Sequence, residues 1–379
     1  MKKLRLLSLV SMVCLSVQLV QAQGLPAGDR ISGPIDFFSS PKPDAHQPVI
    51  DAINSARSSI KMKMFHLSDP NVANALIEAA KRNVDVKLIL DKIQWNNPKD
   101  VTLNDTMTQA GVKLVKSSDG FSITHEKSMI VDDNKAMVST MNQVKNFAVT
   151  LDFGVFVTDA GVISEMNSVY EADWQNAAAS TAVTPPLSNP FLVWSPVNSN
   201  QKLVDLIQTA QDKIDLFVEN FSSTDISNAL IERAGKNKAI RVIVPYCNAG
   251  KSNFNYPSIT ALRAAGIDAR MLPGPATADL PYVHAKAIVV DQKQAFMGSE
   301  NFSFNSLTKA REVGIIVPDE KIAGDVTSQF EVYWPKAVAP PTDPNYTCSA
   351  WLATDPNKGG SGGGSNGLFL LPSAFDLSR

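Results

Sequence analysis

The chain has 379 residues, of which 44% are hydrophobic and 19% are charged, and its formal net charge is −2. This length suffices for two domains with buried cores, and the composition is that of a globular protein rather than a disordered or fibrous one. The slight acidity disfavours binding of nucleic acid through bulk charge. Three cysteines without a CxxC spacing exclude a zinc ribbon, a thioredoxin-type site and a dense disulfide scaffold.

The first 22 residues have the pattern of an export signal. Lys2, Lys3 and Arg5 precede an apolar run over 6–20, which ends in the small-x-Ala sequence Val20-Gln21-Ala22. We expect cleavage near Ala22/Gln23 and an exported mature protein, either periplasmic or secreted. A retained membrane anchor is the alternative, but the run is short for crossing a bilayer.

The rest of the chain contains an internal repeat of about 155 to 160 residues, which is typical of tandem domains rather than of a solenoid. In the first copy, helical spacing over 51–56 and 71–81 alternates with short β runs over 60–65 and 86–90. The second copy follows the same order, and Asn74–Glu78 is repeated as Asn228–Glu232. Helical segments between strands predict βαβ units in a mixed sheet that is covered by helices.

We therefore predict an α/β protein with two tandem domains, 23–180 and 181–338, whose sheets are related by a pseudo-twofold axis and share one active site. A linker rich in Ala, Ser, Thr and Pro is expected over 177–190. A Pro/Gly/Ser-rich tail follows over 339–379, and its Gly/Ser tract precedes the apolar Leu368–Leu371. This apolar end could dock on the body, contact a membrane or lack a fixed structure.

Two of the four histidines lie at equivalent positions of the repeat, each in an H-x-K-x4-D motif. Residues i and i+2 of a strand face the same side, so each His and its Lys point into a common cleft. By the same parity the Asp points away from the cleft, and we expect it to hold local backbone. The motif residues are His125, Lys127 and Asp132 in the first copy and His284, Lys286 and Asp291 in the second.

This pair of motifs resembles that of the phospholipase D superfamily over roughly residues 30–335. The second copy has the longer form of the motif, which includes Gly298-Ser299-Glu300-Asn301. The first copy has Ser139-Thr140-Met141-Asn142 there and keeps only the Asn. The resemblance implies two phospholipase D-like domains and a phosphohistidine intermediate, with no metal or other cofactor. The sequence also lacks a His/Asp/Glu cluster with metal-ligand spacing.

Two imidazoles and two lysines that meet across the pseudo-twofold form a cationic site for one phosphodiester. A neutral imidazole can attack phosphorus, and a protonated one can donate to the leaving oxygen. The resemblance favours His125 as the nucleophile and His284 as the acid and later the base, and the reverse assignment stays open. We expect the non-bridging oxygens to be held by Lys127, Lys286, Asn142 and Asn301, with further hydroxyl donors from Thr140 and Ser299.

Each imidazole needs a partner on its other nitrogen if the pKa values of the two histidines are to be pushed apart. Asp152 and Glu312 are the candidates, because they lie at equivalent points 27 and 28 residues after the two histidines. The alternative for each is a solvated acid in a turn. His66 ends a β run, and we expect a structural role, with a place in the cleft wall as the alternative. His46 starts a helix and is expected to be exposed.

Cys247 and Cys348 are the cysteines of the expected mature chain. In an oxidising compartment they would form a bridge between the second domain and the tail, or remain two separate buried thiols.

A phospholipase D that removes head groups at a membrane surface is the leading interpretation. Its partner would be the phospholipid, met peripherally, and no obligate protein partner is implied. An exported, metal-independent nuclease is disfavoured because removal of the three basic leader residues lowers the net charge from −2 to −5. The cleavable leader disfavours a cardiolipin synthase-type phosphatidyl transferase. Retention of both His/Lys pairs and both asparagines disfavours a non-catalytic binding module.

Overall fold

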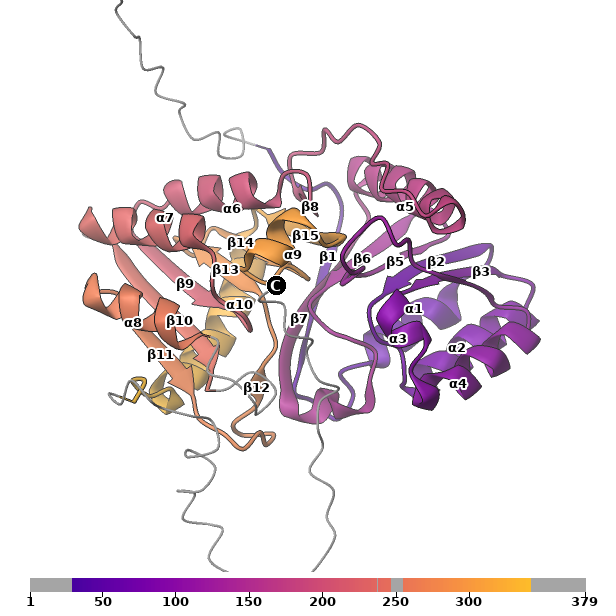
Figure 1. Ribbon diagram of the computed structural model, residues 1–379, viewed down its shortest axis with the longest axis horizontal. Helices are drawn as coiled ribbons and strands as arrows, with labels where there is room; N and C mark the ends of the chain where they lie inside the picture. The colour runs from indigo at the N-terminus through magenta and orange to yellow at the C-terminus, as the bar shows by residue number, and fades with distance from the viewer. Residues whose placement is uncertain (1–28, 237, 247–254, 342–379) are drawn as a thin grey trace, which may run out of the picture.

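The computed structural model describes residues 29–236, 238–246 and 255–341, and places two mixed sheets side by side with helices around them (Figure 1). The expected export signal, both cysteines of the expected mature chain and the Gly/Ser tract lie outside the described residues. The elements of the first half are β1 (Ile35–Ser40), α1 (Gln47–Ser55), β2 (Ser59–Met64), α2 (Pro70–Lys81), β3 (Asp85–Leu90), α3 (Lys92–Trp95), α4 (Pro98–Gln109), β4 (Lys113–Lys116), β5 (Lys127–Val131), β6 (Lys135–Ser139), a 3-10 turn (Lys145–Val149), β7 (Thr150–Val157) and α5 (Ala160–Ala179).

The second half repeats this succession. Its elements are β8 (Leu192–Ser195), α6 (Ser199–Gln208), β9 (Lys213–Phe217), α7 (Thr224–Gly235), β10 (Ala239–Pro245), α8 (Tyr256–Ala264), β11 (Asp268–Leu272), β12 (Tyr282–Val283), β13 (Ala287–Val290), β14 (Gln294–Gly298), α9 (Phe304–Thr308), β15 (Glu312–Val317), α10 (Glu320–Tyr333) and a 3-10 turn (Trp334–Lys336).

The two sheets have the same strand order, as the sequence repeat predicts. The first runs β4-β3-β2-β5-β6-β7-β1 and the second β11-β10-β9-β13-β14-β15-β8. In each, the first three strands are parallel and the remaining pairs are antiparallel. The mixed α/β architecture with two repeated halves is therefore confirmed.

Local sequence determines where helix α2 begins and where helix α5 ends, and the end of α5 differs from the prediction. Asp69 caps α2 by accepting from the Asn71 amide, and Pro70 occupies the first helical position, where its missing N–H costs nothing. Helix α5 continues through Ala179 before Ser180 takes a left-handed conformation with φ 55°. The helix thus extends three residues into the predicted linker, because Ala177–Ala179 favour helix as well as loop.

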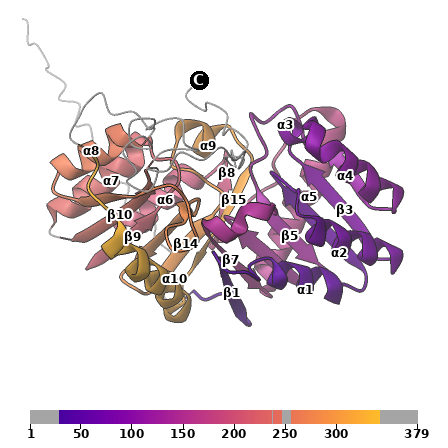
Figure 2. The ribbon, with the colours of Figure 1, turned by 90° about the horizontal axis from the view of Figure 1, so that it is seen from below.

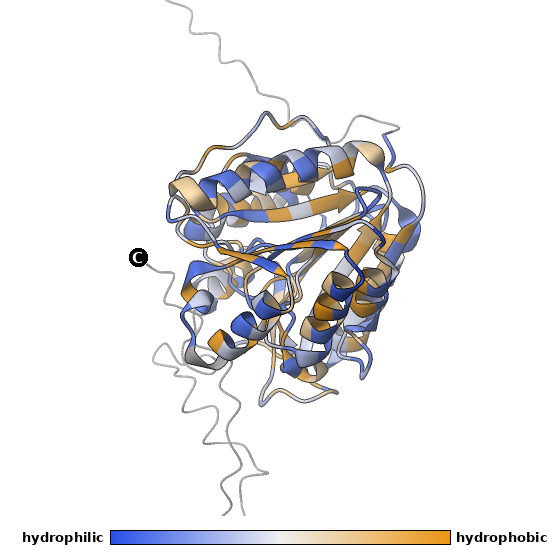
Figure 3. Ribbon diagram, turned by 90° about the vertical axis from the view of Figure 1, so that its right-hand side faces the viewer, coloured by the Kyte–Doolittle hydropathy of each residue, from blue (hydrophilic) through white to orange (hydrophobic). Residues whose placement is uncertain are grey.

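Three apolar layers hold the fold together. The outer layers lie beneath α1, α2 and α4 in the first half and beneath α6, α7 and α8 in the second. The central layer lies between the halves, where α5 and α10 pack on the sheets (Figure 2). There, Phe153 of β7 contacts Phe217 of β9 at 5.6 Å between ring centroids. Hydrophobic residues gather on the strands and on the inward helix faces (Figure 3). Within the described ranges, no helix is both long enough and apolar enough to cross a membrane.

The halves exchange backbone contacts reciprocally at the two motifs. The amide of His125 donates to the carbonyl of Arg311 at 3.0 Å, just before β15. In the other direction, β12 pairs in parallel with the start of β7, and the amide of His284 donates to the carbonyl of Leu151 at 3.1 Å. Such reciprocity is what a twofold relation between the halves requires.

Buried charges reinforce this junction. Asp173 of α5 accepts from Lys63 of β2 at 2.9 Å and lies 3.0 Å from the guanidinium of Arg311 in the second half. Lys63 also pairs with Glu126 at 2.8 Å. All four side chains are at most 6% exposed, so each charge depends on its partners for compensation.

Replacing Asp173 with Ala leaves the Arg311 guanidinium buried without its carboxylate. We expect D173A to lower the free energy of unfolding by about 3 kcal/mol in urea denaturation. The matched control is E171A on the same helix, since Glu171 is 47% exposed and pairs with Lys61 at the surface. This control should change stability by less than about 0.5 kcal/mol. Equal effects of the two variants would contradict the role of the buried network.

Candidate active site

The reciprocal backbone contacts bring both motifs to the junction of the halves, each beside an acid of the other half. Nδ1 of His125 lies 2.8 Å from Oε2 of Glu312, and Nδ1 of His284 lies 2.6 Å from Oδ1 of Asp152. The histidine–acid pairs are therefore crossed, which the spacing along the chain did not reveal. In both cases Nδ1 is occupied, and Nε2 remains as the nitrogen that can react.

The surroundings of His125 favour an uncharged imidazole. Burial, with the charges of Lys127 and Lys286, lowers the pKa of His125 well below its usual value. Burial also raises the pKa of Glu312 to about 8, although the charge of Lys127 opposes the shift. The edge of the imidazole packs against Phe65, with ring centroids 4.7 Å apart. A neutral imidazole with a free Nε2 lone pair can act as a nucleophile.

The imidazole of His284 has carboxylates on two sides. Burial raises the pKa of Asp152, but the charges of His284 and Lys286 and the hydroxyl of Thr140 outweigh it, so that the pKa lies below its usual value. Asp152 is thus a carboxylate at Nδ1, and Oε2 of Glu219 lies 3.7 Å from Nε2 on the other side of the ring. His284 is thus placed between two carboxylates, whereas His125 is not.

The two lysines differ in their compensation. Lys286 Nζ donates to Glu219 Oε2 at 2.9 Å and to the carbonyl of His284. Lys127 Nζ donates to the carbonyl of His125 and lies 5.1 Å from the Phe65 ring centroid, and among the described residues no carboxylate lies within salt-bridge distance. Burial and the charge of Lys286 lower the pKa of Lys127 to about 7. Of the two lysines, Lys127 is therefore the one whose ammonium group is not paired with a carboxylate of the described residues and can bind an anion.

The structure assigns the two motif hydroxyls to the protein itself rather than to a phosphate. Thr140 donates to Asp152 at 2.6 Å, and the Ser299 hydroxyl accepts from the Val313 amide at 3.1 Å. The expectation of hydroxyl donors to the substrate is thus corrected: both groups fix the acid-bearing strands. Asn301 accepts from the Asn220 amide at 3.0 Å. Within the described chain, the side-chain oxygen of Asn142 is buried without a partner.

Asp132 and Asp291 face away from the cleft and bind backbone. Asp132 accepts from the amides of Arg57, Ser58 and Ser59, and Asp291 accepts from the amides over 211–213. Burial opposes ionisation of Asp132, but the backbone donors prevail and lower its pKa to about 2. These carboxylates hold the backbone at the start of β2 and of β9.

The other two histidines lie in buried acid pairs of the first half. His46 is 3% exposed and its Nδ1 lies 2.6 Å from Asp69, so the expectation of an exposed residue was wrong. The cause is the cap of α2, which supplies a buried carboxylate 23 residues further on. His66 Nε2 lies 3.0 Å from Asp100 of α4, which ties His66 to the helical layer rather than to the paired motifs.

Sequence reasoning missed Glu219, Phe65 and Tyr282. Glu219 follows β9 at the position where Phe65 follows β2, as the pairing of β2 with β5 and of β9 with β13 shows. The sequence did contain a signal for Glu219: at this position of the repeat, the second copy has an acid where the first copy has the aromatic Phe65.

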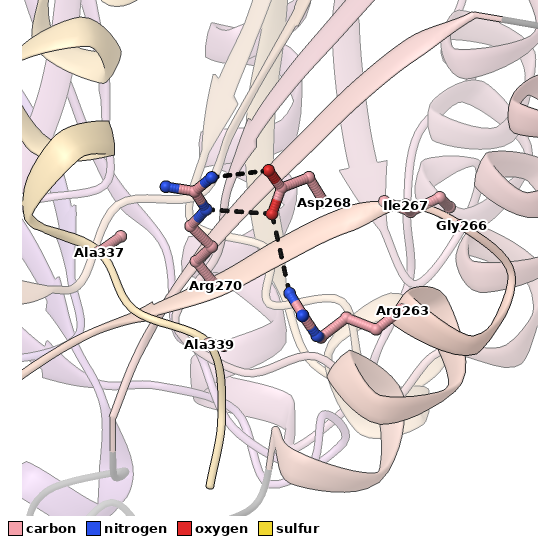
Figure 4. A pocket seen from close by; sticks show the side chains of 7 residues that line it. All are labelled: Arg263, Gly266, Ile267, Asp268, Arg270, Ala337 and Ala339. Carbon is pink, nitrogen blue, oxygen red and sulfur yellow. Dashed lines mark hydrogen bonds and ion pairs between the residues drawn. The ribbon is translucent and has the colours of Figure 1, made fainter. Parts of the chain in front are cut away.

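A hollow away from the paired motifs lies at the outer edge of β11 (Figure 4). Arg263 and Arg270 converge there on Asp268, which lies 2.8 Å from the Arg270 guanidinium. None of the motif residues lines it.

In the described part of the chain, no group of three His, Cys, Asp or Glu side chains is placed to hold a metal ion.

Comparisons with known proteins agree with this geometry. The family described as "Cardiolipin synthase, PLD-like domain" matches residues 49–174 and 203–334. The chain therefore belongs to the phospholipase D superfamily, and each half is one PLD-like domain. Among solved structures, phosphatidylserine synthase from Haemophilus influenzae Rd KW20 covers 80% of this chain and 86% of its own, with a TM-score of 0.61 and 14% identity, which shows the fold.

The curated relatives have different activities in their names. Cardiolipin synthase A of Proteus mirabilis (strain HI4320) is 22% identical over 75% of this chain and 66% of its own length. Phospholipase D Z of Dictyostelium discoideum is 23% identical over 49% and 47%, respectively. A 5'-3' exonuclease of Homo sapiens is 28% identical over 42% and 35%. The chain thus spans less than two thirds of the length of each of these relatives.

The charge of Lys127 gives the site a pH-dependent affinity for anions. Because its pKa is lowered to about 7, Lys127 is protonated below that pH and loses its charge above it. We expect the affinity for sulfate, whose charge is constant from pH 5 to 9, to fall as the pH rises through about 7. K127R should retain affinity to higher pH, because a guanidinium stays protonated. Calorimetric titration at several pH values measures this, and an identical midpoint in K127R would contradict it.

Proposed function

We propose that this protein cleaves the head group from a phospholipid by two phosphoryl transfers through a phosphohistidine on His125. The observation that carries the proposal is the unequal pair of imidazoles, one neutral beside an acid of raised pKa and one between two carboxylates. This assignment gives His125 the role of nucleophile and His284 that of acid and base.

In the first step, the Nε2 lone pair of His125 attacks phosphorus and forms the P–N bond. The P–O bond to the head group breaks, and its oxygen takes the proton from Nε2 of His284. In the second step, water attacks phosphorus and gives a proton to His284 while the P–N bond breaks. The products are the head-group alcohol and phosphatidic acid, and both histidines return to their first state.

Lys127 is the proposed main ligand of the non-bridging oxygens, since its charge is not compensated by a carboxylate of the described residues. Lys286 would assist, and the Asn142 and Asn301 amides are proposed as further donors. Such donors are in place before the reaction, so little reorganisation is needed when charge moves in the transition state.

Two relatives and the net charge favour a lipid as the substrate. Cardiolipin synthase A and phospholipase D Z support a lipid phosphodiester, and the acidic net charge weighs against tracking of a nucleic-acid backbone. Cardiolipin synthase A also supports a second candidate, in which an alcohol replaces water and the phosphatidyl group is transferred. We propose export to the periplasm or the medium through the N-terminal leader, so that the protein would meet lipid at a membrane surface.

Bis(p-nitrophenyl) phosphate, which has a good leaving group, separates the two roles. We expect H284A to accumulate phosphohistidine on His125, because this leaving group departs without an acid but the second step lacks its base. H125A should lose turnover by at least about 10³-fold and form no adduct. Mass spectrometry under alkaline quench locates the adduct, and an adduct on His284 in H125A would reverse the assignment.

Phospholipid vesicles and single-stranded DNA, offered in parallel, separate the substrate classes. We expect the full-length mature chain to release head group from vesicles and leave DNA intact, with the H125A/H284A double variant as the control for contaminants. Cleaved DNA with untouched lipid would contradict the lipid proposal and support a nuclease.

A further inference from the structure

The two halves of the site differ at a position that contacts the motif residues on both sides. After β2 the chain places Phe65 against His125 and Lys127, and after β9 it places Glu219 against His284 and Lys286. The repeat therefore has an apolar wall beside the nucleophile and a carboxylate beside the proposed acid.

Glu219 is held firmly in this place. It is 6% exposed, and its Oε1 accepts from the Tyr282 hydroxyl at 3.0 Å. Its Oε2 accepts from Lys286 at 2.9 Å and from the Asn301 amide at 3.4 Å. A carboxylate offers about four lone-pair positions, so these three donors leave room for one more. Burial raises the pKa of Glu219, but the charges of Lys286 and His284 outweigh it and keep the group ionised.

This position decides which part of a substrate Glu219 meets. The phosphate oxygens are drawn toward Lys127, and the leaving oxygen must reach Nε2 of His284 to receive its proton. Nε2 is 3.7 Å from Glu219 Oε2. A group attached three bonds beyond the leaving oxygen, such as the nitrogen of an amino alcohol, therefore comes within reach of the carboxylate, whereas the acyl side of the phosphodiester does not have to pass it.

We propose that Glu219 is a specificity-determining residue that selects a leaving alcohol bearing a protonated amine, as in an amino-alcohol head group. The inference rests on the proposed function, because it takes His284 as the acid. An ammonium beside the leaving oxygen fills the last lone-pair position with a charge-assisted hydrogen bond. A neutral polyol gains less, and a leaving group that carries another phosphate is repelled by the carboxylate at low dielectric.

The same residue would make Lys286 the weaker of the two lysine ligands of the phosphate. Glu219 compensates Lys286 and leaves Lys127 uncompensated, so the substrate is bound in one direction in a site whose two histidines are otherwise related by the repeat. The direction in which the substrate binds and the choice of head group would thus both follow from Glu219 standing where the first half has Phe65.

The test compares phosphatidylethanolamine with phosphatidylglycerol, each diluted equally in micelles of one neutral detergent. The reference substrate is bis(p-nitrophenyl) phosphate, whose leaving group has neither a positive charge nor a hydrogen-bond donor. We expect the wild-type chain to prefer the ethanolamine lipid by about tenfold in kcat/KM. In E219Q, and in E219F, which copies Phe65, this preference should fall by about tenfold while the reference substrate is still cleaved. D215N is the matched control, since Asp215 is a buried acid of β9 that pairs with Arg241 instead; its preference should equal that of the wild type.

A wild-type preference near one, or a preference that E219Q leaves unchanged while the reference is cleaved, overturns this inference alone. Cleavage of the reference without cleavage of either lipid overturns the lipid proposal and, with it, the selection of a lipid head group. Failure of the wild type on all three substrates overturns the phosphohistidine proposal itself.

Discussion

The active-site arrangement depends on hydrogen bonds that cross between the two halves of the chain. His125 binds Glu312 and His284 binds Asp152, so that neither half holds both the histidine and the acid of one pair. The backbone sets this up, because the segment before each motif bonds to the strand entry of the other half. Docking of the halves and assembly of the site are therefore one event, and the central apolar layer and the Asp173 ion pairs serve the chemistry as well as stability.

The repeat builds a symmetric frame, and a few side chains then make it directional. Phe65 leaves Lys127 uncompensated, whereas Glu219 neutralises Lys286 and flanks His284. Burial is the main cause that lowers the pKa of His125, and the charges of Lys127 and Lys286 add to it, whereas His284 is less buried and lies beside two carboxylates. One imidazole suited to attack and one suited to donate a proton are what a two-step phosphoryl transfer needs, and a fully symmetric site would provide two of the same kind.

Much of this was predictable, because it depends on local pattern. The repeat indicated equal sheets, and strand parity predicted that His and Lys share a face and that the motif aspartates hold local backbone. The crossing of the acids was not predictable, because spacing along the chain does not say which half a carboxylate will face. The burial of His46 and the use of the Thr140 hydroxyl by Asp152 likewise depend on neighbours brought together only by folding. Glu219 left a signal in the repeat, but its meaning required the geometry.

The protonation state of His125 is the most direct test of its assignment as the nucleophile. Nitrogen NMR of the chain labelled at histidine, with His125 assigned through H125Q, reports the state of each ring nitrogen as the pH is changed. We predict that His125 stays neutral, with its proton on Nδ1 and none on Nε2, at pH values well below the usual pKa of histidine. A His125 imidazole that gains its second proton near pH 6.5, as an unperturbed histidine does, would contradict the assignment of the nucleophile and the directional site built on it.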